Sequence, residues 1–198
     1  MVKSKNNKYS KADSFALEAK KKGYRSRSAL KLIEILKKDE LIKKGMQILD
    51  LGSYPGGWSQ VASEIVGTSG KVFSVDRQPM KQIDNTKFYQ LSMQDLFENV
   101  PWAEFQSFNL VLSDLAPNIS GIREKDDAEM ISLLKTVFKI NELYLNQKGH
   151  LVIKVFQGES FDFAKKYIES NFNKVKIRKP SSSRSNSSET YLLALDKL

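Results

Sequence analysis

The chain has 198 residues, of which 40% are hydrophobic and 28% charged, and its formal net charge is +9. This length is enough for one domain with a sizeable core, and the composition is ordinary for a globular protein. The absence of cysteine excludes disulfides, thiolate metal sites and cysteine nucleophiles, and the single histidine, His150, would have to carry any zinc site or Ser-His-Asp triad alone. No apolar run approaches the roughly 18 residues of a membrane span, so we expect no membrane partner.

The positive charge lies at the two ends of the chain. Residues 1–44 carry fourteen Lys or Arg and five Asp or Glu, a balance of +9, residues 45–172 have a balance of −4, and residues 173–198 one of +4. This distribution suits a polyanion that crosses one face, and nucleic acid is the leading candidate. Residues 1–12 have little to bury, so we expect a disordered basic tail without the apolar stretch of a signal peptide. The first arginine is Arg25, which gives an organellar presequence little support.

The remaining residues, 13–198, are expected to form one domain in which helices and apolar strands alternate. Apolar residues at helical spacing predict two helices between Asp13 and Lys44, broken at Gly23 and Tyr24, and further helices at 58–66, about 127–145 and 160–171. Apolar segments predict strands at 46–52, 71–76, 87–92, 108–114 and 150–157. Two more strands, at 175–179 and 190–195, are joined by a polar loop and are expected to form an antiparallel edge. The repetition predicts an α/β fold with a mostly parallel, doubly wound sheet and helices on both faces.

The segment DLGSYPGGW, residues 50–58, follows the first strand and opens a helix. Ligands of an open α/β sheet bind at the carboxyl ends of its strands, so a nucleotide-like cofactor would lie at this turn. Asp76 ends the second strand, 24 residues after Gly52, where its carboxylate can accept hydrogen bonds from both ribose hydroxyls of an adenosine. The turn lacks the GxGxxG of nicotinamide-linked reductases, and an acidic residue before its first glycine suits a cationic ligand such as S-adenosylmethionine. Asp95 could then accept a hydrogen bond from the adenine amino group. The alternative is that residues 50–58 form a plain tight turn or a site for another nucleotide.

Lys154 stands inside an otherwise apolar strand, HLVIKVFQ, residues 150–157. An isolated buried ammonium is costly, so this lysine needs a partner or must lose its charge. Asp114 ends the strand that should lie beside it, and the two side chains are expected to meet at the cofactor edge. A lone lysine is usually a surface group and such an aspartate is often a helix cap, but the apolar neighbours make Lys154 a candidate functional residue.

Five segments of the chain resemble, in order and spacing, the FtsJ (RrmJ/RlmE) ribosomal RNA 2′-O-methyltransferases. They are YRSRSALKL (24–32), DLGSYPGGWSQ (50–60), SDLAPNISG (113–121), KVFQGE (154–159) and KPSSSRSNSSETY (179–191). The resemblance runs from about residue 13 to the end and implies a Rossmann-like, S-adenosylmethionine-dependent methyltransferase fold with a seven-stranded sheet. It also implies a Lys-Asp-Lys-Glu catalytic tetrad, which falls on Lys31, Asp114, Lys154 and Glu189.

The same resemblance implies a set of cofactor-binding residues and no metal. The family's contacts map onto Gly56, Trp58, Asp76, Asp95 and Asp114, and we add Gly52, Pro55 and Gly57 from the glycine turn. Ser53 and Tyr54 depart from the two small residues that are usual in bacterial members, which leaves the local shape of the turn open. Gly52 and the Gly56-Gly57 pair are more similar to the bacterial and mitochondrial large-subunit branch than to the transfer-RNA and nucleolar branches.

Basic residues flank the expected tetrad and are predicted to bind RNA phosphates. They are Arg25 and Arg27 at the start of a helix, and Arg178, Lys179 and Arg184 before Glu189. The serine-rich run 181–188 is either a flexible linker or a loop that contacts the substrate, and its position beside Glu189 favours the loop.

These observations together predict methylation of a ribose 2′-oxygen in RNA with S-adenosylmethionine as the donor. The first candidate is a uridine of large-subunit ribosomal RNA, free or within the large ribosomal subunit, and the enzyme is expected to be a monomer. Lys154 is the candidate base: burial and Lys31 favour its neutral amine, whereas Asp114 and Glu189 favour the ammonium. The alternatives are a 2′-O-methyltransferase of transfer RNA or cap RNA, and an inactive RNA-binding relative. The compartment stays open between a bacterial cytoplasm and a eukaryotic organelle or nucleus.

Overall fold

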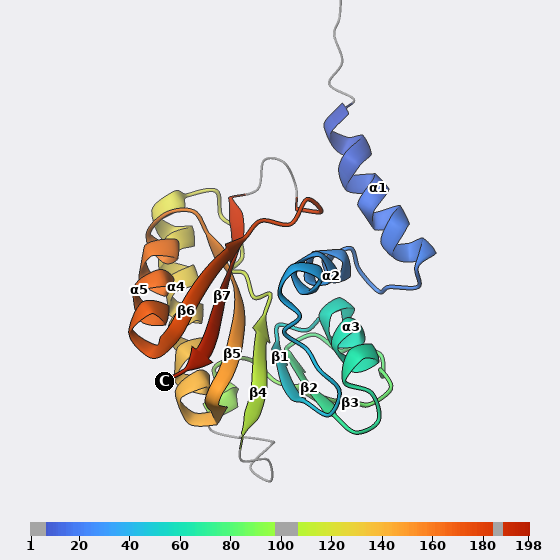
Figure 1. Cartoon of the computed structure of the whole chain (residues 1–198). Helices are drawn as coiled ribbons and strands as arrows, with labels where there is room; N and C mark the ends of the chain where they lie inside the picture. The colour runs from blue at the N-terminus through green and yellow to red at the C-terminus, as the bar shows by residue number, and fades with distance from the viewer. Residues whose placement is uncertain (1–6, 98–106, 184–187) are drawn as a thin grey trace, which may run out of the picture.

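One seven-stranded sheet runs through the protein and carries helices on both faces (Figure 1). The computed structural model describes residues 7–97, 107–183 and 188–198. The strand order is β3-β2-β1-β4-β5-β7-β6. The first five strands in this order are parallel to one another, and β7 runs antiparallel to both β5 and β6. The predicted α/β fold, with a mostly parallel sheet and an antiparallel edge, is therefore confirmed.

The elements follow the predicted order closely. The strands are β1 (Gln47–Leu51), β2 (Lys71–Asp76), β3 (Thr86–Gln90), β4 (Phe108–Ser113), β5 (Leu145–Phe156), β6 (Phe172–Arg178) and β7 (Glu189–Lys197). The helices are α1 (Asn7–Lys21), α2 (Ser28–Asp39), α3 (Gly57–Val66), α4 (Arg123–Tyr144) and α5 (Glu159–Asn171), with a short 3-10 turn, η1 (Asp95–Phe97). β5 begins earlier than predicted, because Leu145 pairs with Phe108 across a register shift before the regular ladder starts at His150. No helix in the described ranges is long and apolar enough to cross a membrane.

Alternate residues of the central strands feed two separate apolar clusters. In β1, Leu49 and Leu51 pack with α4 and α5, whereas Ile48 packs with α2 and α3 on the other face. The same period of two places Val152 of β5 on the α2/α3 face. Lys154 is the next residue on that face, at the carboxyl end of the strand. This explains how an ammonium can stand in a buried strand: it lies where the α2/α3 face reaches the edge of the sheet.

The N-terminal helix begins earlier than the sequence indicates. The predicted break between the first two helices is confirmed, since Gly23 adopts a positive φ of 77° between α1 and α2. However, α1 starts at Asn7, so residues 7–12 are helical rather than part of a disordered tail, and residues 1–6 lie outside the described part of the chain. Helix extension adds one hydrogen bond per residue at little cost once a turn exists, so a buried Ala19 near the end of α1 can support a helix that extends away from the body (Figure 1).

Candidate active site and cofactor cavity

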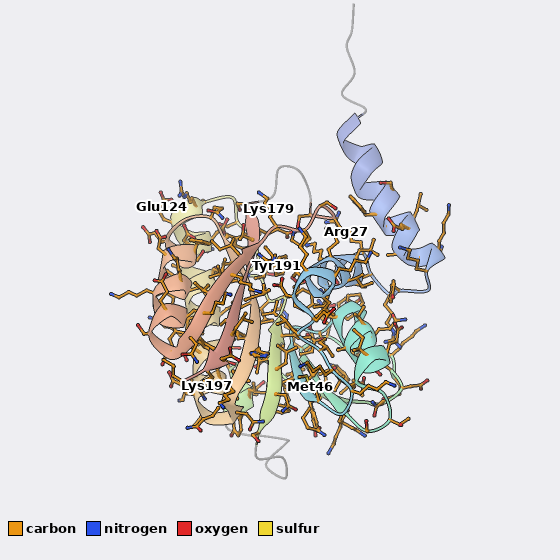
Figure 2. The ribbon with its side chains drawn as sticks, viewed as in Figure 1. Arg27, Met46, Glu124, Lys179, Tyr191 and Lys197 are labelled. Atoms are coloured by element: carbon orange, nitrogen blue, oxygen red, sulfur yellow. The ribbon has the colours of Figure 1, made fainter. Side chains whose placement is uncertain are left out.

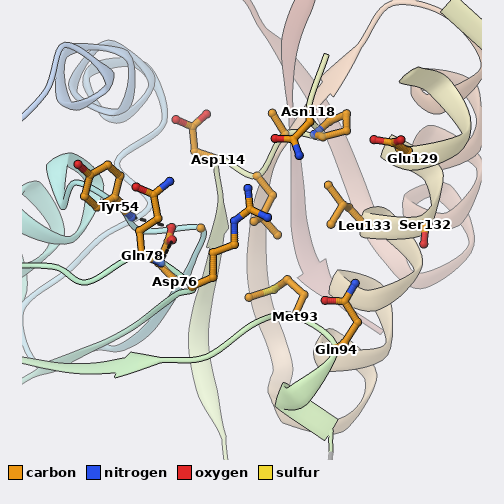
Figure 3. A pocket seen from close by; sticks show the side chains of 15 residues that line it. Tyr54, Asp76, Gln78, Met93, Gln94, Asp114, Asn118, Glu129, Ser132 and Leu133 are labelled. Carbon is orange, nitrogen blue, oxygen red and sulfur yellow. Dashed lines mark hydrogen bonds between the residues drawn. The ribbon is translucent and has the colours of Figure 1, made fainter. Parts of the chain in front are cut away.

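A cavity of about 460 Å³ opens at the carboxyl ends of β1, β2 and β4 (Figure 3). This volume lies within the roughly 300–1,000 Å³ of small-molecule sites. One side of the cavity is formed by the turns after the strands, including Gly52, Tyr54 and Asp76. The opposite wall comes from α4 and is formed by Glu129, Ser132 and Leu133. The cavity therefore occupies the position at which the sequence predicts a cofactor.

Asp76 is held in place by the backbone of two turns. The Tyr54 amide donates to its Oδ2 at 2.9 Å and the Gln78 amide to its Oδ1 at 2.8 Å. Each carboxylate oxygen can accept a second hydrogen bond, so a fixed Asp76 can still bind two neighbouring hydroxyls. Gly52 completes this side: its φ is +77°, and a Cβ there would lie 2.6 Å from the Leu115 side chain, which also lines the cavity.

Several residues predicted to bind the cofactor, from the resemblance or from the glycine turn, do not line the cavity. They are Pro55, Gly56, Gly57, Trp58 and Asp95. The Asp95 carboxylate accepts a hydrogen bond from Ser92 at 2.6 Å. A Cβ at Gly57 would meet the Ser26 hydroxyl and lie 3.2 Å from the Ala29 amide, so this glycine permits close packing of α3 on α2. The role of these residues in cofactor binding stays a prediction.

Trp58 supports the start of α2 rather than the cavity. Its indole nitrogen donates to the Ser28 carbonyl at 2.8 Å, and its ring lies 5.6 Å from that of Tyr191. The side chain is buried in the α2/α3 cluster. The indole thus fixes the helix that carries Lys31.

The four residues of the predicted tetrad form two buried ion pairs. Lys154 Nζ lies 3.1 Å from Asp114 Oδ1 and donates to the Asp114 carbonyl at 2.5 Å. Lys31 Nζ donates to Glu189 Oε1 at 2.5 Å. The side chains are only 7–18% exposed, which means that these charges are shielded from bulk water. The expected contact between Asp114 and Lys154 is confirmed, and the catalytic roles stay predictions.

Tyr191 links the two ion pairs, and the sequence reasoning missed it. Its hydroxyl donates to Asp114 Oδ1 at 2.9 Å, and Lys31 Nζ lies 5.9 Å from its ring centroid. Tyr191 is fully buried, and burial followed by the charges of Asp114 and Glu189 raises its pKa well above the usual value. Tyr191 therefore acts as a neutral donor. Its signal in the sequence is its position two residues after Glu189 on one strand, which places both side chains on the same face.

Burial raises the pKa of two nearby carboxyl groups, Glu189 and Asp50, but their net pKa shifts are opposite. Burial raises the pKa of Glu189, but the hydrogen bond and charge of Lys31 lower it further, so Glu189 titrates below its usual range. Asp50, under the glycine turn, is completely buried, and burial raises its pKa to about 7 despite a hydrogen bond from Ser59 at 2.6 Å. The charges of Asp114 and Asp76 add to this increase. Asp50 is thus partly protonated near neutral pH.

The predicted RNA-binding cations differ in how free their donors are. The Arg25 guanidinium donates to the carbonyls of Lys81 and Gln82, both at 2.5 Å, and so ties down the loop after β2. Arg178 donates to both oxygens of Asp39, at 2.6 and 2.8 Å.

Two other predicted cations remain available to a ligand. Arg27 is half-buried and Lys179 exposed, and neither side chain donates to an acceptor in the described part of the chain. Figure 2 shows both toward the end of the molecule where Tyr191 lies. Arg184 lies outside the described residues. Direct RNA binding stays a prediction and depends most on Arg27 and Lys179.

A Rossmann-like sheet with a cofactor-sized cavity at its carboxyl edge, beside two buried lysine–carboxylate pairs, is the arrangement that the resemblance to methyltransferases predicts. The model of the FtsJ-like methyltransferase family matches residues 24–197, and the chain belongs to this family. It is 44% identical over 185 residues to the ribosomal RNA large subunit methyltransferase E of Stutzerimonas stutzeri, covering 92% of this chain and 90% of that protein.

Solved structures agree with this assignment. A Plasmodium falciparum protein described as a ribosomal RNA methyltransferase superposes with a TM-score of 0.77 at 30% identity, over 88% of this chain and 99% of that one. Fibrillarin of Aeropyrum pernix, crystallised with S-adenosyl-L-methionine, superposes with a TM-score of 0.58 at 13% identity, over 78% of this chain and 68% of that one. The second likeness shows the fold alone.

Proposed function

We propose that this protein transfers a methyl group from S-adenosylmethionine to the 2′-hydroxyl of a ribose in large-subunit ribosomal RNA, with a uridine as the first candidate. The observation that carries the proposal is the position of Asp114, which lines the cofactor cavity and also pairs with the buried Lys154 at 3.1 Å. Asp114 thus connects the cavity for the methyl donor to Lys154, the side chain that can accept a proton. The relative at 44% identity is named a methyltransferase of this RNA, which supports the choice of substrate.

The chain offers groups that fit the cofactor. When bound, S-adenosylmethionine supplies an electrophilic methyl group on a positively charged sulfur. Asp76 would accept hydrogen bonds from the ribose hydroxyls, and the absence of a side chain at Gly52 makes room for Leu115, which lines the cavity. Asp114 contributes the negative charge that favours a cation at its end of the cavity.

Lys154 is proposed to accept the proton of the ribose hydroxyl. In the structure its Nζ donates to the Asp114 carbonyl and forms an ion pair with Asp114 Oδ1, which fixes the position of the nitrogen. To accept this proton, Lys154 must be neutral when it acts.

The substrate is tested by offering several RNAs to the same enzyme. Labelled S-adenosylmethionine is incubated with free large-subunit RNA, assembled ribosomal particles and transfer RNA, and the modified nucleotide is mapped. We expect the label on a 2′-oxygen of large-subunit RNA, with the comparison of free RNA and particles showing which form is used. Label on transfer RNA alone, or on a base, would contradict the proposal.

We also propose that the enzyme acts as a single-domain monomer. Size-exclusion chromatography with light scattering should give the mass of one chain, both alone and in the presence of a polyanion. A stable dimer at assay concentrations would contradict this part of the proposal.

A further inference from the structure

Three charged side chains of α2 bind the segment that leads from β6 into β7. Lys31 pairs with Glu189 at the start of β7, and Asp39 binds Lys176 and Arg178 of β6. Between them, Glu34 binds the loop that follows β6. The helix is therefore fixed to both strands of the C-terminal hairpin and to the loop between them.

The Glu34 carboxylate binds mainly the backbone amides of the loop. One carboxylate oxygen accepts from the Ser181 amide at 2.6 Å and from the Ser181 hydroxyl at 3.0 Å, and the other accepts from the Ser182 amide at 3.0 Å. Burial raises the pKa of Glu34, but the hydrogen bonds from Ser182 and Ser181 lower it further, so the carboxylate is charged at neutral pH. Hydrogen bonds to a charged group are stronger than neutral ones. The first residues of the serine-rich run are thus anchored, whereas a flexible linker would have no such partners.

The anchored loop leads directly to the tetrad. Ser183 follows the two residues that Glu34 holds, and its amide donates to the Pro180 carbonyl at 3.1 Å, which closes a turn. Glu189 begins β7 six residues further along the chain. Glu189 in turn pairs with Lys31, which precedes Glu34 by three residues and so lies on the same face of α2. One face of α2 thus holds both Ser181 and Ser182, through Glu34, and Glu189 at the start of β7, through Lys31.

We propose that Glu34 is a positioning residue for methyl transfer: by holding residues 181–183 against α2, it fixes Glu189 and keeps Lys31 beside the acceptor ribose. The inference rests on the proposed function, because it assigns the held loop to RNA methylation. Lys179 immediately precedes the loop, so the same contacts set the direction in which this exposed cation faces the substrate. Glu34 itself touches neither the cavity nor the Lys154–Asp114 pair.

The first test compares Glu34→Ala with Glu34→Gln. The glutamine keeps one side-chain oxygen that can accept a hydrogen bond from a backbone amide of the loop. We expect Glu34→Ala to lower kcat on large-subunit RNA by about tenfold to a hundredfold, the usual effect of losing hydrogen bonds to a charged group. Glu34→Gln should give a smaller loss, of about threefold to tenfold, because its oxygen still accepts from one serine amide while its NH2 group faces the other N–H without bonding to it. Glu169→Gln, which removes an exposed pair with Lys165 on α5, serves as the matched control and should not change kcat.

Calorimetry separates positioning from misfolding. Glu34→Ala should still bind one S-adenosylmethionine per chain, with a Kd within about twofold of wild type, because the cavity lies on the other face of the sheet. A double-mutant cycle with Glu189→Gln then tests whether Glu34 acts on turnover through Glu189. Once Glu189 is changed, Glu34→Ala should lower kcat by no more than about twofold further. A full kcat in Glu34→Ala, or a full additional loss in the double variant, would overturn the inference.

Amide hydrogen exchange decides the matter without an activity assay. The Ser181 and Ser182 amides should exchange about tenfold faster in Glu34→Ala than in wild type or Glu169→Gln. Unchanged exchange would overturn the inference whatever the enzyme methylates. If wild type methylated no ribosomal RNA while exchange still responded to Glu34, the proposed function would fail and the anchoring of the loop would stand.

Discussion

The cofactor cavity and the tetrad lie at the same edge of the sheet but on different faces, and they are built in different ways. The cavity lies toward α4 and is shaped by turns that are local in sequence, such as the backbone amides that hold Asp76. The tetrad lies toward α2 and depends on side chains that are far apart in sequence, such as Lys31 and Glu189. Asp114 belongs to both regions. Changes on the tetrad side should therefore affect turnover, and changes on the cavity side should affect cofactor affinity.

The largest effect on the tetrad side is expected for Lys154→Ala, which removes the proposed base. Removing a general base typically lowers turnover by about a hundredfold to ten-thousandfold, and we expect a loss of kcat in this range. S-adenosylmethionine affinity should change little, since Lys154 does not line the cavity. The measurement is single-turnover methylation of RNA together with calorimetric titration of the cofactor. Lys165→Ala, which removes an exposed lysine of α5, is the control; near-normal kcat in Lys154→Ala with cofactor bound would refute its role as base.

The reverse pattern is expected for Asp76→Ala. Loss of an acceptor for two hydroxyls should weaken S-adenosylmethionine binding by about tenfold to a hundredfold, while kcat at saturating cofactor stays close to wild type. Titration calorimetry gives the Kd, and initial rates at rising cofactor concentration separate KM from kcat. Asp84→Ala changes an exposed aspartate of the same loop and should alter neither. An equal loss of kcat would mean that the two regions are not separable.

Asp50 connects the two regions, because the charges of both Asp114 and Asp76 raise its pKa. With a folded-state pKa of about 7 against an ordinary 3.8, the unfolded chain releases this proton at lower pH than the folded protein does. The contribution of Asp50 to stability is therefore complete below about pH 4, falls as the pH rises to about 7, and is constant above that. Asp50→Asn keeps an oxygen for Ser59 and cannot ionise.

The stability gain of Asp50→Asn should consequently grow with pH and reach a few kcal/mol above neutrality. Thermal unfolding of both proteins without cofactor, from pH 4 to pH 9, measures it. A difference in melting temperature that did not change with pH would show that Asp50 ionises normally in the folded state.

The smallest effect is expected for Trp58→Phe, which sharpens the division between cavity and tetrad. The change removes the hydrogen bond to the Ser28 carbonyl and should lower the free energy of unfolding by about 1 kcal/mol. Cofactor affinity should stay unchanged, because the indole lies in the α2/α3 cluster. Chemical denaturation and calorimetry give the two quantities. A marked loss of affinity would assign the Trp58 side chain to the cofactor after all.

Local patterns in the sequence were enough for the sheet, its antiparallel edge and the contact between Asp114 and Lys154. Strand and helix periodicities arise from neighbouring residues, and the doubly wound order places the ends of β4 and β5 side by side. The same patterns missed the early start of α1, because helix extension depends on the helix already formed and not on further burial.

The family resemblance placed Lys31 and Glu189 in one tetrad, but their pairing and the links through Tyr191 and Glu34 followed only from the structure. The contacts of Lys31 with Glu189 and of Glu34 with Ser181 join residues 158 and 147 positions apart, and they exist because α2 docks against β6 and β7. The bond from Tyr191 to Asp114 spans 77 positions and joins β7 to the end of β4. The same holds for Arg25 and Arg178: the sequence shows their positive charge, but only the structure shows which groups accept their hydrogen bonds. The sequence by itself determined which elements form and which residues carry charge. Only the tertiary structure decided which charges meet, because a side chain's partner depends on how distant elements pack and not on its neighbours along the chain.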